Sequence, residues 1–348
     1  MASPRRSGCN YLAPLFVAAF FAAVNAAPAH VKSARIHLAP LLVKGETIRY
    51  RIDTQASIGG ATTSPIMNPE GAKNEDRSTS LEIRLDVLDA PSASAGGAGG
   101  ARLRVTYDLA HAASSSDAYD PGVTAFDEAY DKLEGHSMEF TMSPTGGISG
   151  VSGLEDIFSN PSVAQSMKDW MTGFSYSEGV PKEGIEIGQK WSREIPAENL
   201  PLRGLFWRVE STYLRNESCS PQPDFSGNAP GENPTPDDAR KPDLCAVILT
   251  ESTLDRHGSA HGEETPDDYL HNGLRTSGTW NGTAESLDSI SLRSGWIVVS
   301  TATVSEKMDY EIKSVQSGSA LHHTGAVNTQ THIAMLTPSS APSPSPGK

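Results

Sequence analysis

Residues 81–87 read LEIRLDV, so that every second side chain is apolar and the ones between are charged. Successive side chains of a strand point to opposite faces, and this alternation therefore predicts a strand with one buried and one solvated face. The same pattern recurs at 48–53 (IRYRID) and at 102–109 (RLRVTYDL). Strands buried on one face only are typical of antiparallel sheets.

Further strands are predicted along most of the chain, and residues 292–296 (LRSGW) predict a tight hairpin turn between two of them. With about ten or eleven strands and one helical region, the expected fold is mainly β, a large curved antiparallel sheet or half-barrel. The additional predicted strands are 138–142, 187–195, 203–215, 244–254, 272–287, 289–293, 296–313 and 327–336.

One helical region is predicted over about 153–172, packed on the sheet. Ser152 and Glu155 have the spacing of a capping box, and the glycine-rich run 146–153 is expected to form a turn into this helix. An apolar stripe with helical spacing follows. It is either ordinary core or a lid that contacts an apolar ligand, and as a ligand site it would comprise Val163, Met167, Trp170 and Met171.

The first 26 residues have the three parts of a removable secretory signal. Arg5 and Arg6 precede an apolar run at 11–24, and Val24-Asn25-Ala26 offers small residues for cleavage. A retained anchor is the alternative, but the run is shorter than the ~20 residues of a spanning helix. No later segment is apolar enough to span a membrane. We therefore expect a periplasmic or extracellular protein.

The expected mature protein is one β-rich domain over 27–336, with two sub-halves that meet near 175–185. Residues 337–348 (TPSSAPSPSPGK) predict a disordered tail. The chain has 28 basic and 42 acidic residues, and without Arg5 and Arg6 the net charge is 26 − 42 = −16. Such a charge argues against nucleic acid as a partner, because nucleic-acid binding needs basic patches.

Removal of the signal leaves two cysteines, Cys219 and Cys245, for which an oxidising compartment favours a disulfide over two free thiols. The enclosed loop is rich in Pro, Asp, Asn and Gly, and closing it would stabilise the protein by roughly 3.5 kcal/mol. Asn216 and Asn281 begin sequences that match the N-glycosylation pattern. The source of the chain would decide whether they are used.

The polar clusters do not predict chemistry. Residues 257–271 (HGSAHGEETPDDYLH) contain imidazoles and carboxylates, but their glycines and proline disrupt any regular ligand spacing, which favours a solvated loop. His322 and His323 are adjacent and would point to opposite faces of a strand. Residues 173–177 lack the second glycine of a nucleophile elbow. We expect no catalytic residue, metal or cofactor, and no enzyme.

Three glycine- and tryptophan-bearing motifs resemble those of exported bacterial β-rich proteins: 188–191 (GQKW), 277–280 (SGTW) and 293–297 (RSGWI). The sheets of these proteins are similar to the half-barrel of periplasmic lipoprotein carriers. There, a curved antiparallel sheet and a helical lid enclose an apolar cavity. The resemblance spans about residues 45–313, implies the fold and carries over no catalytic residue.

Two classes of function follow from these patterns. The protein binds an apolar or lipid-like ligand between the sheet and the helical stripe, or it is an envelope structural or interaction module with a filled core. A continuous apolar cavity would favour the first class, and a packed interior would favour the second.

Overall fold

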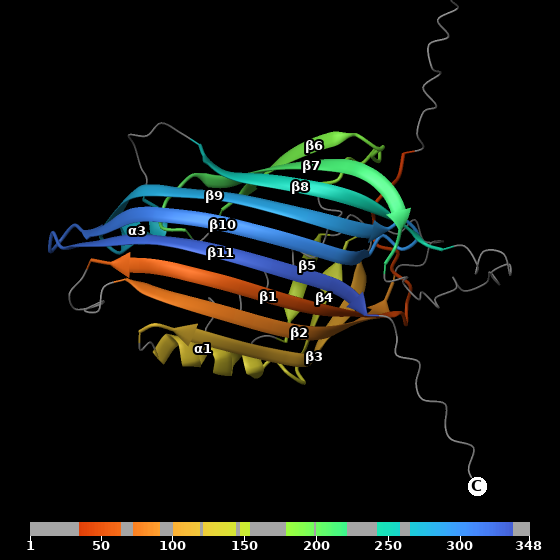
Figure 1. The fold of residues 1–348 in the computed structure, drawn as a ribbon, viewed down its shortest axis with the longest axis horizontal. Coiled ribbons are helices and arrows are strands. Elements are labelled where there is room, and N and C mark those ends of the chain that lie inside the picture. The colour runs from red at the N-terminus through yellow and green to blue at the C-terminus, as the bar shows by residue number, and fades with distance from the viewer. Residues whose placement is uncertain are drawn as a thin grey trace, which may run out of the picture. The chain divides into compact units, whose positions relative to one another are not determined.

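The computed structural model describes residues 35–63, 72–90, 100–118, 121–143, 147–153, 179–197, 200–220, 242–257 and 265–336 (Figure 1). Their strands form one antiparallel sheet of eleven strands, which confirms the predicted fold class. The strands are β1 (Thr47–Thr62), β2 (Lys73–Asp89), β3 (Ala101–Ser116), β4 (Ser137–Met142), β5 (Ile148–Ser152), β6 (Lys190–Pro196), β7 (Leu205–Ser218), β8 (Leu244–Arg256), β9 (Leu274–Ser291), β10 (Ile297–Ser314) and β11 (Ala320–Leu336).

The strand order is β5-β4-β3-β2-β1-β11-β10-β9-β8-β7-β6, so the first and last strands of the chain pair in the middle of the sheet. Two meanders, β1 to β5 and β6 to β11, are thus joined through the β1–β11 ladder (Figure 1). The sheet is open, with β5 and β6 at its edges. Within each meander, strands that follow one another in the chain pair antiparallel and need no crossover connection.

The alternation in the sequence sets which side chains share a face. Across β1 and β2, Ile48 pairs with Leu85 and Tyr50 pairs with Ile83, and all four are buried. We call the face that carries Tyr50 the inner face and the opposite one the outer face. A one-residue slip would exchange the two faces, so the buried side chains fix the register.

The sheet curls toward its inner face. Ile148 of β5 and Ile297 of β10 line the same pocket, although five strands lie between them in the sheet order. In Figure 1, β4 and β5 accordingly lie behind the central strands. The curl brings the inner-face side chains of the two meanders together, as the twist and coiling of a large antiparallel sheet allow.

The inner face has three zones along the strands. The end that carries the start of β1 and the end of β11, which we call the disulfide end, holds the largest buried apolar cluster, including Leu81, Leu103 and Phe140. The opposite end, which we call the far end, holds a smaller cluster around Leu205 and Leu254. Between them a row of small residues crosses eight strands: Ser211, Thr250, Ser286, Ala302, Thr331, Thr54, Thr79 and Ala112.

Helix α1 (Pro121–Asp131) protects an edge of the sheet. Strand β4 pairs with β3 only as far as Thr106, which leaves the second half of β3 without a strand neighbour on that side. There, Asp131 accepts a hydrogen bond from the Ala112 backbone N–H and Asp127 accepts one from that of Ser114, each at 3.0 Å. Carboxylates thus replace the missing strand and blunt an edge that otherwise invites further pairing.

Several local predictions need correction. Residues 148–152, expected in a turn into a helix, form the edge strand β5, because Ile148 and Val151 pack against the large apolar cluster. The strands predicted at 272–287 and 289–293 are one strand, β9. Helix α1 was not predicted. Helix α3 (Asp267–His271) lies within the stretch predicted as loop.

One further prediction is confirmed, and others concern residues that the structure does not describe. The hairpin turn at 292–296 is present, closed by a hydrogen bond of 2.9 Å from the Ser291 N–H to the Trp296 carbonyl. The predicted signal, the tail at 337–348 and nearly all of the predicted helical region lie outside the described residues. None of the helices that the structure describes has the length and hydrophobicity to span a membrane.

Candidate functional site

The disulfide end of the inner face contains an apolar pocket. Its lining residues come from the segment before β1, from β1 to β5, from the β9–β10 turn, and from β10 and β11, and none of those described is charged. The free volume is about 40 Å³, far below the ~300 Å³ or more of typical ligand pockets. The side chains therefore nearly fill this space. The lining residues are Pro40, Tyr50, Ile83, Leu85, Val105, Met138, Phe140, Met142, Ile148, Gly295, Trp296, Ile297 and Ile333.

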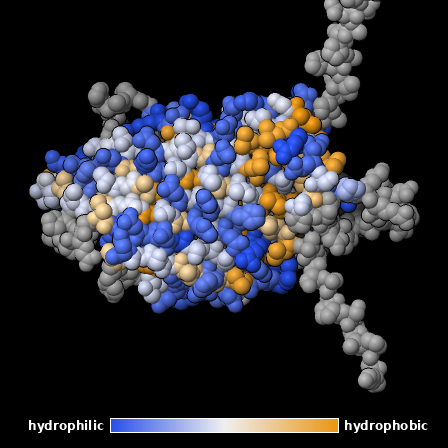
Figure 2. All heavy atoms as spheres, viewed as in Figure 1, coloured by the Kyte–Doolittle hydropathy of each residue, from blue (hydrophilic) through white to orange (hydrophobic). Residues whose placement is uncertain are grey.

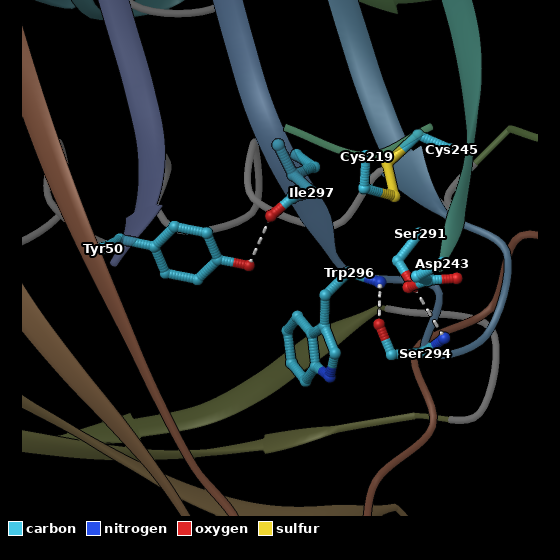
Figure 3. The surroundings of a disulfide bond; sticks show 8 residues. All are labelled: Tyr50, Cys219, Asp243, Cys245, Ser291, Ser294, Trp296 and Ile297. Carbon is cyan, nitrogen blue, oxygen red and sulfur yellow. Dashed lines mark hydrogen bonds between the residues drawn. A yellow bond between two sulfur atoms is a disulfide. The ribbon is translucent and has the colours of Figure 1, made fainter. Parts of the chain in front are cut away.

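Trp296 closes the pocket from the β9–β10 turn (Figure 3). Gly295 precedes it with φ 70°, and a Cβ at this glycine would lie 2.1 Å from the Ala39 carbonyl oxygen. The segment before β1 therefore packs directly on the turn. The Trp296 N–H donates to Ser294 Oγ at 3.3 Å, and Ser294 N–H donates to Ser291 Oγ at 3.0 Å. The turn sequence thus aims the indole at the inner face.

The Trp296 indole is 6% exposed, and its Nε1–H has no hydrogen-bond partner among the described residues. A buried donor without a partner is costly in free energy and calls for an explanation. By contrast, the Tyr50 hydroxyl on the other side of the pocket donates to the Ile297 carbonyl at 2.9 Å (Figure 3). Of these two pocket side chains, Trp296 is thus the one whose polar atom has no partner among the described residues.

Two carboxyl groups lie on the inner face at this end. Burial raises the pKa of Glu46, and one of its carboxylate oxygens is buried without a hydrogen-bond partner among the described residues. Burial also raises the pKa of Asp288, which accepts hydrogen bonds from Ser300 Oγ at 2.6 Å and Ser286 Oγ at 2.9 Å. Neither group forms a salt bridge with a residue that the structure describes. Among the described residues that line the pocket, none brings a positive charge to a ligand.

The predicted disulfide between Cys219 and Cys245 is present, with the two Cα atoms 5.0 Å apart (Figure 3). Both residues are buried, and they pack with Val298 at the start of β10. Close by, Ser291 Oγ donates to the Asp243 carboxylate at 2.5 Å. The cross-link thus joins the end of β7 to the start of β8, and the Ser291–Asp243 hydrogen bond connects this region to the turn that carries Trp296.

The outer face has larger hollows of a different character. Two of them, with volumes of about 580 and 470 Å³, share Asn328 and Gln330 and are lined mainly by serine, threonine and other polar residues. Figure 2 shows this face as mostly hydrophilic, with hydrophobic residues gathered toward the disulfide end. Leu287, on the outer face of β9, is 43% exposed. The hollows are too polar to hold an apolar ligand.

The ligand residues predicted from the helical stripe, Val163, Met167, Trp170 and Met171, lie outside the described residues, so their role stays a prediction. The polar stretch at 257–271 is described in part: His257 stacks on Phe206 at 3.7 Å and contacts Glu194. The part of the chain that the structure describes holds no group of metal-ligating side chains.

The pair of adjacent histidines behaves as predicted. His322 contacts Asp309 at 2.6 Å on the outer face, while His323 stacks on Tyr310 of the inner face at 4.9 Å. The two imidazoles therefore cannot bind one ion together.

No protein-family model matches the sequence, and no characterised protein matches it. Among solved structures, the chain is similar to lipovitellin in a structure described as lipid–protein interactions in lipovitellin. The TM-score is 0.45 with 11% identity, over 86% of this chain and 26% of the lipovitellin chain. The chain thus spans about a quarter of lipovitellin, and at this level the likeness supports no argument about function.

The sequence did not predict which residues line the pocket, although one of its motifs contains a lining residue. The motif at 293–297 was singled out for its glycine and tryptophan, and it places Trp296 in the pocket. The methionines at 138 and 142 were assigned to a strand, yet nothing local showed that they would face β10 across the curl. That juxtaposition depends on curvature accumulated over several strands.

Proposed function

We propose that the protein is an exported, non-enzymatic binding protein for an uncharged apolar ligand, which enters the pocket at Trp296 with a single alkyl chain. The observation that carries the proposal is the wholly uncharged lining around a buried indole whose N–H has no partner among the described residues. A hydroxyl or ester oxygen at the head of such a chain would accept that hydrogen bond. Export is in keeping with the disulfide, which persists in oxidising compartments.

The free volume of the pocket is too small for an alkyl chain unless the lining rearranges. With about 40 Å³ free, an alkyl chain enters only if lining side chains move. Met138 and Met142 are suited to this, because unbranched methionine side chains repack at low cost. Both belong to β4, next to the edge strand β5, where the sheet has few neighbours to resist the change.

The charges favour an uncharged ligand over a fatty-acid anion. Glu46 and Asp288 lie on the same end of the inner face, and no basic side chain lines the described pocket. An anionic head group brought there would lose hydration without gaining an ion pair. An alcohol or a glyceride of the same chain length has no such penalty.

A structural or interaction module with a filled core is the second candidate. Its support is the same 40 Å³, since a pocket this small is also what a packed core leaves behind. In that case the exposed Leu287 of the outer face would be the more relevant surface.

Displacement of Nile red by dodecanol and by dodecanoate separates these candidates. The binding protein should take up dodecanol at least tenfold more tightly than dodecanoate. Ile148→Trp, which fills the pocket from the edge strand, should weaken dodecanol binding at least tenfold, whereas Leu287→Trp on the outer face should not. If the protein binds neither compound, or if Ile148→Trp and Leu287→Trp change dodecanol binding equally, the filled-core module remains as the function.

A further inference from the structure

The far end of the inner face holds a carboxylate in an apolar setting. Glu306 of β10 lies on the inner face, directly across from Val327 of β11 on one side and Gly282 of β9 on the other. Along its own strand the next inner-face residues are Val304 and Met308. Charged side chains are rarely placed in such surroundings without a partner.

Two indoles flank this carboxylate. A Cβ at Gly282 would lie 2.6 Å from Cη2 of Trp207, so the Trp207 ring occupies the space above Gly282, opposite Glu306. Trp280 lies diagonally across from Glu306, next to Gly282 on the same face of β9. Its ring stacks on Tyr310 at 5.8 Å, and its Nε1–H is buried without a hydrogen-bond partner among the described residues.

Glu306 has no cationic partner within the described part of the chain. Nearby carboxylates of the outer face are paired, such as Asp255 with Arg208 at 3.0 Å and Asp309 with His322 at 2.6 Å. Glu306 forms neither a salt bridge nor a geometrically sound hydrogen bond there. Burial raises the pKa of its carboxyl group, and the nearby Trp280 indole lowers it in part. A negative charge at this position therefore has no cationic partner among the described residues, and the Trp280 indole offsets only part of the cost of its burial.

We propose that Glu306, Trp207 and Trp280 form a binding site for an organic cation, a quaternary ammonium group such as that of choline. Indole rings attract such cations through their negative faces, and a carboxylate adds a direct charge interaction. A quaternary ammonium fits better than a metal ion, because its methyl groups contact the apolar neighbours Val304 and Met308 and need no oxygen ligands. The group could come from free choline or from a phosphocholine lipid head.

This site is independent of the pocket at Trp296. Glu306 lies nine positions after Ile297 along β10, which is roughly 30 Å at ~3.3 Å per residue. The row of small residues that crosses the inner face lies between them. Loss of one binding activity therefore leaves the other to be measured.

Saturation-transfer NMR on the methyl protons of choline chloride tests the proposal, with sodium chloride used to hold the ionic strength constant. We expect saturable binding that Glu306→Gln weakens at least tenfold. Glu285→Gln, on the outer face of the neighbouring strand, is the matched control and should bind as the unaltered protein does. Trp280→Leu keeps the carboxylate and should weaken binding several-fold, so that the test does not depend on one variant.

Competition with vesicles then distinguishes the two sources of the cation. Phosphatidylcholine vesicles that displace choline, when phosphatidylglycerol vesicles do not, would identify a lipid head group as the ligand. Displacement by neither would identify a soluble cation. The proposal is overturned if choline shows no saturable binding, or if Glu306→Gln and Glu285→Gln bind it equally.

Discussion

The two ends of the inner face use tryptophan in opposite ways. At the disulfide end Trp296 is buried among apolar side chains in a space that is almost filled. At the far end Trp207 and Trp280 are only partly buried, and a carboxylate without an ionic partner among the described residues lies beside them. The same ring thus stabilises the sheet where curvature brings layers together, and remains available to a ligand where it does not.

The largest expected effect is on the free energy of unfolding when each tryptophan is removed. Trp296→Ala should cost about 3–5 kcal/mol, as for other buried aromatic residues. Trp280→Ala should cost about 1–2 kcal/mol, because part of its ring is already exposed. Urea unfolding followed by circular dichroism measures both. Equal losses would show that the two ends are packed alike.

Trp296→Phe is the control for the same comparison. It keeps most of the ring and removes an N–H that has no partner among the described residues. The loss of stability should therefore stay below about 1.5 kcal/mol. A loss close to that of the alanine variant would mean that the indole N–H has a partner, such as a buried water.

Removal of the disulfide should destabilise the protein by about 3.5 kcal/mol in the chain-entropy model. The double variant Cys219→Ala with Cys245→Ala tests this by thermal unfolding. The cross-link anchors the disulfide end alone, so choline binding at the far end should survive in the folded variant. A loss of both stability and choline binding would show that the two ends are coupled.

The edge of the sheet differs between the two ends as well. Near the disulfide end β3 is paired with β4, whereas toward the far end α1 covers it with carboxylates. Asp127→Ala removes the acceptor for both the N–H and the hydroxyl of Ser114 and should cost about 1–3 kcal/mol. Glu128→Ala, on the same helix, is the matched control. Light scattering on heating should also show earlier aggregation of the Asp127 variant alone.

The smallest effect concerns the buried carboxyl of Asp288. Burial raises its pKa in the folded protein, so its ionisation opposes folding once the pH exceeds the ordinary carboxyl pKa. Asp288→Asn should therefore gain stability relative to the unaltered protein, and the gain should grow as the pH is raised from 4 to 7. Chemical unfolding at the two pH values checks the sign. A gain that does not change with pH would point to packing instead.

The fold class was predictable because its signal is local. Alternation at 81–87 and 102–109 states which side chains face inward, and the turn at 292–296 is encoded by its own residues. Helix α1 could not be predicted in the same way. Its carboxylates accept hydrogen bonds from N–H groups of β3. Those N–H groups lack a strand partner only because β4 does not extend along the second half of β3.

The sequence by itself determined most of the strands, their buried faces and the cysteine pair. Period-two patterning acts over short stretches, and the oxidising compartment that the sequence predicts favours a disulfide. The tertiary structure alone decided which residues meet. Pairing of β1 with β11 joins the two ends of the chain, and the curl sets Trp296 against Met138. Likewise, only strand register places Trp207 over Gly282 beside Glu306. Such contacts join residues far apart in the chain, and their geometry is the sum of twists over many strands.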